Sequence, residues 1–249
     1  MKIAIIAVNR YGESIAELLK KDFENASIFK IQRGSGTETL SNIVGKIFNE
    51  YEGLIFIAAL GIVVRIISPF IKDKFKDPAV VCVDTAGRFA ISVLSGHEGG
   101  ANWLSYLVAR CLDALPIITT GKETRKKIII GIGCRRGVSV NKVKKAILTA
   151  LKEKNIELDQ IRLAATIDLK KHEEGLIKAT SELGLPLVFI PKESVDNFQG
   201  PVSSSEIVKR NIGLEGVCEP CALLAGRRTK LILKKKIING VTVAIARES

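Results

Sequence analysis

A glycine-rich stretch at residues 95–102, Ser-Gly-His-Glu-Gly-Gly-Ala-Asn, contains the first residues that could do chemistry. Glycines between a strand and a helix let the backbone approach a ligand closely, and the N–H groups left free there suit an anion or a carboxylate. His97, one of two histidines in the chain, could act there as a general acid or base, or as an axial ligand to a metal that arrives with a ligand. The alternative is a loop histidine that hydrogen-bonds only the backbone.

A second candidate is the stretch Gly-Ile-Gly-Cys-Arg-Arg-Gly at residues 131–137. It matches neither the dinucleotide-binding pattern nor the phosphate-binding loop of nucleoside triphosphatases, so a nucleotide site has little support. Arg135 and Arg136 stand before Gly137 at a predicted helix entrance. Guanidinium groups bind carboxylates through two parallel hydrogen bonds, which predicts a carboxylate clamp. The alternative is a pair of solvated arginines at a tight turn.

The third candidate is Gly-Val-Cys-Glu-Pro-Cys at residues 216–221. A Cys-x-x-Cys pair can serve a redox or metal site, but no second pair or nearby histidine completes four zinc ligands. The pattern therefore favours two small buried cysteines. Glu219, at a predicted helix start, is either a partner for the helix dipole or a group that contacts a ligand.

The net charge of +12 is distributed unevenly along the 249 residues. Residues 1–120 contain 13 Lys and Arg against 12 Asp and Glu, whereas residues 121–249 contain 25 against 14. A basic half indicates an anionic partner, either nucleic acid or a multiply charged small molecule, unless its lysines simply form a solvated surface. Only 5% of residues are aromatic and no nucleic-acid-binding motif is present, which argues against nucleic acid.

Five cysteines are an odd number for a disulfide framework and fit a reducing compartment. No apolar run reaches the roughly 20 residues of a membrane helix. The N-terminal segment lacks the long apolar region and the cleavage site of a signal peptide. Together these observations predict a cytoplasmic protein without a membrane partner.

Apolar runs that alternate with helical spacing predict an α/β protein, with two three-layer α/β/α domains at residues 1–120 and 128–249. The polar segment 121–127 is expected to be a short charged linker. Thr85, Ala86 and Gly87 predict a hairpin, Ser139 a helix N-cap, and Ser203–Ser205 the N-cap of a further helix. Strands are expected at 3–8, 28–31, 53–60, 115–120 and 127–133, and helices near 171–183 and 219–225.

Two blocks in each half resemble a known family. Residues 80–102 (VVCVDTAGRFAISVLSGHEGGAN) and 61–70 (GIVVRIISPF) resemble the N-terminal domain of the CbiG family of cobalamin biosynthesis. Residues 127–139 (KIIIGIGCRRGVS) and 216–226 (GVCEPCALLAG) resemble its C-terminal domain, which stand-alone CobE proteins share. The resemblance covers both halves in the expected order.

This resemblance implies a hydrolase that opens the δ-lactone of cobalt-precorrin-5A with water and releases acetaldehyde, giving cobalt-precorrin-5B. No organic cofactor is implied, because cobalt arrives with the substrate, and no metal bound by the protein itself is expected. The partner would be an anionic corrinoid, with other enzymes of the pathway and a second copy of the chain as further candidates. The competing interpretation is a corrinoid-binding protein that hands an intermediate over without catalysis.

The site expected on this basis uses His97 and Glu219 for proton transfer, with free N–H groups near Gly99 and Gly100 stabilising the oxyanion. Substrate-binding residues are expected to be Gly96, Gly99, Gly100, Asn102, Arg135, Arg136 and Gly137. The chain departs from the family pattern in three ways. It lacks the middle domain common in the family, it has Glu98 where an aliphatic residue is usual, and it has Cys221 where a small residue is usual.

Overall fold

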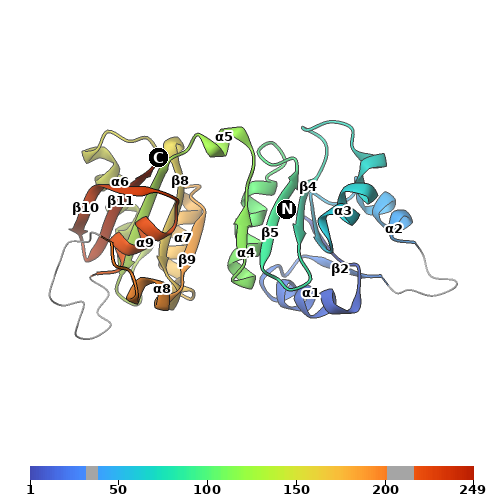
Figure 1. Ribbon diagram of the computed structural model, residues 1–249, viewed down its shortest axis with the longest axis horizontal. Helices are drawn as coiled ribbons and strands as arrows, with labels where there is room; N and C mark the ends of the chain where they lie inside the picture. The colour runs from blue at the N-terminus through green and yellow to red at the C-terminus, as the bar shows by residue number, and fades with distance from the viewer. Residues whose placement is uncertain (32–38, 201–215) are drawn as a thin grey trace. The chain divides into compact units, whose positions relative to one another are not determined.

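A computed structural model describes residues 1–31, 39–200 and 216–249, which form two compact units, Met1–Lys122 and Glu123–Ser249 (Figure 1). Each unit is built around its own sheet, so each is considered separately. The predicted N-cap at Ser203–Ser205 lies outside the described residues.

The first unit contains a six-stranded sheet in the order β2-β1-β3-β4-β5-β6. Strands β1 to β4 are parallel, β5 is antiparallel to β4, and β6 is parallel to β5. Every residue of β1, β3 and β4 is buried, as expected for parallel strands that are covered on both faces. The bounds are β1 (Ile3–Ala7), β2 (Ser27–Lys30), β3 (Gly53–Ile57), β4 (Ala79–Val83), β5 (Phe89–Leu94) and β6 (Leu115–Ile117).

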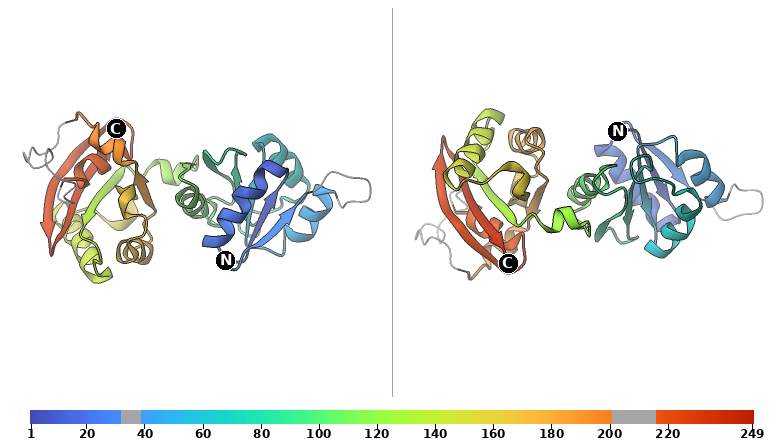
Figure 2. Two further views of the ribbon diagram at one scale, coloured as in Figure 1. Left: turned by 90° about the horizontal axis from the view of Figure 1, so that it is seen from below. Right: turned by 90° about the horizontal axis from the view of Figure 1, so that it is seen from above.

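Helices cover both faces of this sheet (Figure 2). Helices α1 (Arg10–Asp22) and α4 (Ala101–Leu112) bury apolar residues such as Leu19 and Leu104 in one cluster. Helices α2 (Leu40–Ile47) and α3 (Leu60–Ile67) bury Val44 and Val63 in the other. The predicted hairpin joins β4 to β5, and Gly87 supplies its positive φ of 68°.

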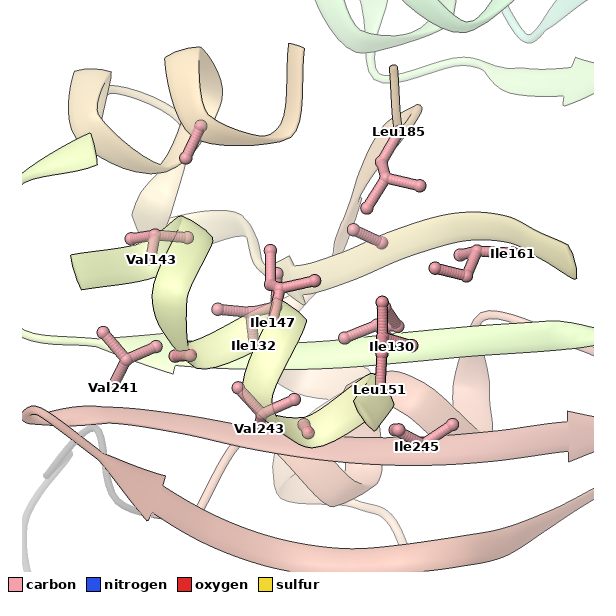
Figure 3. Close-up of a cluster of buried hydrophobic side chains, with 14 of the residues drawn as sticks. Ile130, Ile132, Val143, Ile147, Leu151, Ile161, Leu185, Val241, Val243 and Ile245 are labelled. Carbon is pink, nitrogen blue, oxygen red and sulfur yellow. The ribbon is translucent and has the colours of Figure 1, made fainter. Parts of the chain in front are cut away.

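The second unit contains a five-stranded sheet in the order β10-β11-β7-β8-β9. Strands β7, β8 and β9 are parallel, and β11 pairs antiparallel with both β7 and β10. Figure 3 shows how side chains of β7, β11 and α6 converge on one apolar cluster. The bounds are β7 (Ile128–Cys134), β8 (Ile161–Ile167), β9 (Leu187–Ile190), β10 (Thr229–Ile238), β11 (Val241–Glu248), α6 (Val140–Glu153) and α7 (Glu174–Glu182).

Helix α9 (Cys218–Leu224) packs against β7, β8, β10 and β11. Successive side chains of β7 point to opposite faces of the sheet. Ile130 and Ile132 belong to the cluster that contains α6, whereas Gly131 lies on the opposite face and contacts α9. A Cβ at Gly131 would lie 1.8 Å from the carbonyl oxygen of Cys218. The helix can therefore approach the strand this closely only because residue 131 has no side chain.

The predicted α/β class with helices on both sides of each sheet is confirmed. The segment expected to be a linker contains a short helix, α5 (Gly121–Thr124). The remaining short elements are α8 (Lys192–Asp196) and the 3-10 turns η1 (Ser68–Phe70), η2 (Leu158–Gln160) and η3 (Asp168–Lys170). None of the helices in the described part of the chain is long and apolar enough to cross a membrane.

All five cysteines are free thiols, and both members of the Cys-x-x-Cys pair are fully buried in α9. Burial raises the pKa of Cys218 to about 11, and burial together with the neighbouring Cys218 also raises the pKa of Cys221. A redox pair needs a lowered thiol pKa. The structure thus supports the interpretation of the pair as small core residues.

Replacing Gly131 by Ala is expected to lower the free energy of unfolding of the second unit by about 3 kcal/mol, because the new methyl group would overlap the backbone of α9. Urea unfolding followed by circular dichroism measures the change. Gly61→Ala is the control, since a Cβ there meets no atom within 4 Å. Equal unfolding midpoints for the Gly131 variant and the wild type would contradict the close packing of α9.

The thiols are expected to react slowly in the native protein. Burial raises the pKa of Cys82 and Cys134 to about 11 and that of Cys111 to about 12. A thiol of pKa near 11 is ionised in only about one molecule in a thousand at pH 8, and this fraction rises only as the pH approaches that pKa. Titration with a thiol-specific disulfide reagent should show five fast thiols only in guanidinium chloride. Rapid native labelling of Cys218 or Cys221 would revive a redox role for the pair.

Candidate functional site

In the first unit, the loop of residues 95–100 joins β5 to α4 and folds back on its own first residue. Ser95 has a φ of 53°, and its carbonyl oxygen accepts hydrogen bonds from the N–H groups of Gly99 at 3.0 Å and Ala101 at 3.2 Å. The expectation of a free N–H at Gly99 was therefore wrong. Gly100, with a φ of 86°, precedes α4, and its N–H group donates to no described residue. It is the N–H of this pair that remains open to a ligand.

Two glycines of this loop are required by space. A Cβ at Gly96 would lie 2.6 Å from the Thr120 methyl group and 2.7 Å from the Asn102 Oδ1 atom. A Cβ at Gly99 would lie 2.5 Å from the Ser95 Cβ. The glycines therefore let the loop sit tightly on its surroundings, whatever contact their backbone makes with a substrate.

Asn102 is buried and fastens the start of α4 to the ends of two strands. Its Oδ1 accepts a hydrogen bond from Ser92 Oγ at 2.8 Å, and its Nδ2 donates to Thr120 Oγ1 at 2.7 Å. Ser92 lies in β5, and Thr120 lies three residues after β6. Asn102 thus braces the loop, and direct contact with a substrate stays a prediction.

His97 is exposed at the tip of this loop, and its Nε2 lies 2.5 Å from the Nζ of Lys122. Since a lysine ammonium can only donate, Nε2 accepts in this contact, which leaves Nδ1 as the ring nitrogen that carries a proton. The neighbouring Glu98 pairs with Lys74 at 3.5 Å. Its own backbone N–H first, and Lys74 in addition, lower the pKa of the Glu98 carboxyl, so that it is a carboxylate. The surface here presents the Nδ1–H of His97 close to two ammonium groups, on Lys74 and Lys122, and one carboxylate, on Glu98.

In the second unit, Arg135, Arg136 and Gly137 are exposed between β7 and α6. Neither arginine pairs with any residue that the structure describes. Helix α6 begins at Ser139 without a side-chain cap and without an acidic residue in its first turn. The positive end of the helix dipole and two guanidinium groups without a partner among the described residues together favour an anion at this place.

Glu219 lies in the first turn of α9 and is only 3% exposed. Its Oε1 accepts a hydrogen bond from the backbone N–H of Lys235 in β10 at 2.8 Å. This placement favours a structural role at the helix start, and proton transfer by Glu219 stays a prediction.

The predicted site residues fall into three places. Gly96, His97, Gly99, Gly100 and Asn102 share the loop before α4, Arg135 to Gly137 share the loop before α6, and Glu219 belongs to α9. Within the described ranges, no three His, Cys, Asp or Glu side chains are grouped so that they could hold a metal ion.

Three further residues of these sites gave no signal in the sequence. Lys122 is the last residue of the first unit and lies in α5, 25 residues from His97. Lys170 and Glu173 lie in a run of charged residues that is typical of a solvated surface, yet both are buried, and Glu173 accepts a hydrogen bond from the Gly137 N–H. Lys122 and Glu173 become recognisable only through contacts distant in sequence, and Lys170 only through its burial beside Glu173.

Two family models match the chain, one in each unit. The model described as "Cobalamin synthesis G N-terminal" matches residues 42–123, and that described as "Cobalamin synthesis G C-terminus" matches residues 128–246. Together they span most of the chain in the order in which the family carries them.

Curated relatives extend over the whole chain. A cobalt-precorrin-5A hydrolase of Priestia megaterium is 26% identical over 352 positions, covering 98% of this chain and 94% of its own. A probable cobalt-precorrin-5A hydrolase of Methanocaldococcus jannaschii is 29% identical over 339 positions, covering all of both chains. The Protein CobE of a Sinorhizobium species is 28% identical over 121 residues, covering 48% of this chain and 79% of its own.

The first alignment is 352 positions long and takes in 98% of the 249 residues here, so at least 103 of its positions hold no residue of this chain. The two family models, in contrast, follow one another with only residues 124–127 between them. This agrees with the absence of a middle domain. With both its N-terminal and its C-terminal model matched in order, the chain belongs to the cobalamin synthesis G (CbiG) family.

Proposed function

We propose that the chain is a cobalt-precorrin-5A hydrolase, which opens the δ-lactone of this corrinoid and releases acetaldehyde to give cobalt-precorrin-5B. The observation that carries the proposal is that relatives aligned over nearly the entire chain bear this name. Cobalt enters as part of the substrate, and no organic cofactor is invoked. The five free thiols support a reducing compartment, and so the cytoplasm, as its place of action.

The electrostatics of the second unit suit this substrate. The δ-lactone intermediate carries several peripheral carboxylates, and Arg135 and Arg136 are exposed, unpaired with any described residue, and adjacent to an uncapped helix start. Guanidinium groups bind carboxylates more specifically than ammonium groups do, because two N–H donors align with two oxygens. We assign these two arginines to the peripheral carboxylates.

The first unit offers groups for the hydrolysis itself. Water adds to the lactone carbonyl carbon, the acyl carbon–oxygen bond breaks, and the departing oxygen takes a proton to become a hydroxyl. That hydroxyl then gives up its proton while the bond from its carbon to the macrocycle breaks. Acetaldehyde leaves, and the electron pair stays on the macrocycle carbon, which takes a proton. The free N–H of Gly100 is assigned to the oxyanion in place of that of Gly99. His97 is assigned to the departing oxygen as a general acid through its Nδ1–H, while the Lys122 ammonium, bonded to Nε2, can replace the proton given up.

A protein that hands an intermediate over without catalysis would need the same carboxylate contacts but no proton donor. The hydrolase names of the relatives do not favour that alternative.

Purified protein incubated anaerobically with cobalt-precorrin-5A is expected to release acetaldehyde with multiple turnovers. Added salt should raise KM, because attraction between the arginines and the carboxylates is screened. Coupled alcohol dehydrogenase measures the acetaldehyde. Tight binding without acetaldehyde would identify a hand-over protein, and absence of binding would refute the proposed substrate.

His97→Ala is expected to lower kcat by about 10²- to 10⁴-fold, the usual contribution of a general acid. Lys122→Met should lower kcat less, by about tenfold, because His97 stays in place and solvent can supply the proton that Lys122 otherwise provides. His172→Ala is the matched control, since His172 is the other histidine of the chain and is exposed before α7. Full turnover by the His97 variant would remove this residue from the mechanism.

A further inference from the structure

The connection between β8 and α7 contains a buried pair of opposite charges. Lys170 is 6% exposed and Glu173 is 8% exposed, with Nζ and Oε2 3.7 Å apart. Their neighbours in the same run, His172 and Glu174, are exposed. Charged side chains are rarely buried, and a buried ion pair contributes little net stability over apolar residues of similar volume. Its presence here therefore calls for a role other than stability.

Glu173 uses its second oxygen outside the ion pair. Its Oε1 accepts a hydrogen bond from the backbone N–H of Gly137 at 2.9 Å, across 36 residues of sequence. Gly137 has a φ of 72° and follows Arg135 and Arg136 directly. The carboxylate therefore holds the backbone of the arginine loop at the point where the loop turns toward α6.

A second contact locks the same two segments. A Cβ at Gly175, in the first turn of α7, would lie 1.8 Å from the carbonyl oxygen of Val138. The start of α7 thus meets the arginine loop at two successive residues, Gly137 through a hydrogen bond and Val138 through close backbone approach. The backbone beneath the arginines is fixed, although their side chains are free of partners among the described residues.

The charge of Glu173 would interfere with this loop if it stood alone. An unpaired carboxylate beside Arg135 and Arg136 would attract the guanidinium groups and repel the carboxylates of a substrate. Lys170 cancels that charge inside the protein while leaving Oε1 as an acceptor for Gly137. The pair can hold the loop without competing for its ligand.

We propose that Glu173 is a positioning residue, which orients the Arg135–Arg136 loop for substrate carboxylates through the Gly137 N–H, and that Lys170 neutralises it. This inference rests on the proposed function, since it presupposes that the two arginines bind the substrate. Glu173 acts through the loop and contacts no reacting atom.

Two double variants isolate the hydrogen bond from the ion pair. Lys170→Met with Glu173→Gln removes both charges but keeps a side-chain oxygen for Gly137. Lys170→Met with Glu173→Met removes the charges and the oxygen at similar length. The first is expected to keep KM for cobalt-precorrin-5A within about twofold of the wild type. The second is expected to raise KM about tenfold. Its kcat should stay nearly unchanged, because the lost contact weakens binding of the substrate and of the transition state equally.

The same Met substitutions in an Arg135→Ala, Arg136→Ala background test the route of the effect. In that background, the two Met substitutions should cause no further rise in KM, because the loop no longer carries the arginines that it would position. Equal KM values for the Gln and Met double variants would overturn the role of Glu173. An unchanged KM for the Arg135→Ala, Arg136→Ala protein would instead overturn the arginine assignment in the proposed function.

If the Met double variant does not fold, hydrogen exchange of the Gly137 amide tests the proposal in the wild type and in the Gln double variant. In the wild type, the Gly137 amide should exchange slowly although its residue is exposed, because Glu173 accepts its hydrogen. Lys170→Met with Glu173→Gln should retain that protection. Exchange of the Gly137 amide in the wild type at the rate of an open loop would overturn the proposal.

Discussion

Burial of β7 on both faces is the constraint on which the second unit depends. All seven residues of the strand are buried between β11 and β8. One face needs isoleucines to pack against α6, and the other needs Gly131 to admit the backbone of α9. A strand held in this way cannot shift in register without exposing its core residues. The arginine loop begins where β7 ends, so its starting point is as rigid as the centre of the sheet.

Local patterns in the sequence were sufficient for the architecture. Continuous apolar runs indicated the buried strands, and Gly87 indicated the hairpin between β4 and β5. Contacts made across the fold were not readable in the same way. Nothing near Glu173 in sequence shows that its carboxylate accepts a hydrogen bond from the Gly137 N–H. The free N–H predicted at Gly99 was wrong because the left-handed backbone at Ser95 turns a carbonyl toward it.

The excess of positive charge in the second half has more than one origin. Lys144 pairs with Glu182, and Lys236 pairs with Glu153, so part of the lysine content is neutralised on the surface. Lys230 and Lys234 are exposed along β10, the edge strand of the sheet. Lysines on an edge discourage pairing with strands of other molecules. Among the described residues of the second unit, the arginines before α6 combine positive charge, a fixed backbone, a helix start and the lack of a described partner, which distinguishes a binding place from general basicity.

Each unit completes its own apolar core, and the chain passes from β6 to β7 through a mostly exposed segment with one short helix. Extra chain introduced at this crossing would remove no side chain from either core, and the entropy of a connection grows only slowly with its length. Gene fusion, gene fission or insertion of a whole domain at this point would consequently change the stability of either unit little. The two units could therefore be encoded in one gene or in two during evolution, with the apolar core of each unit unchanged.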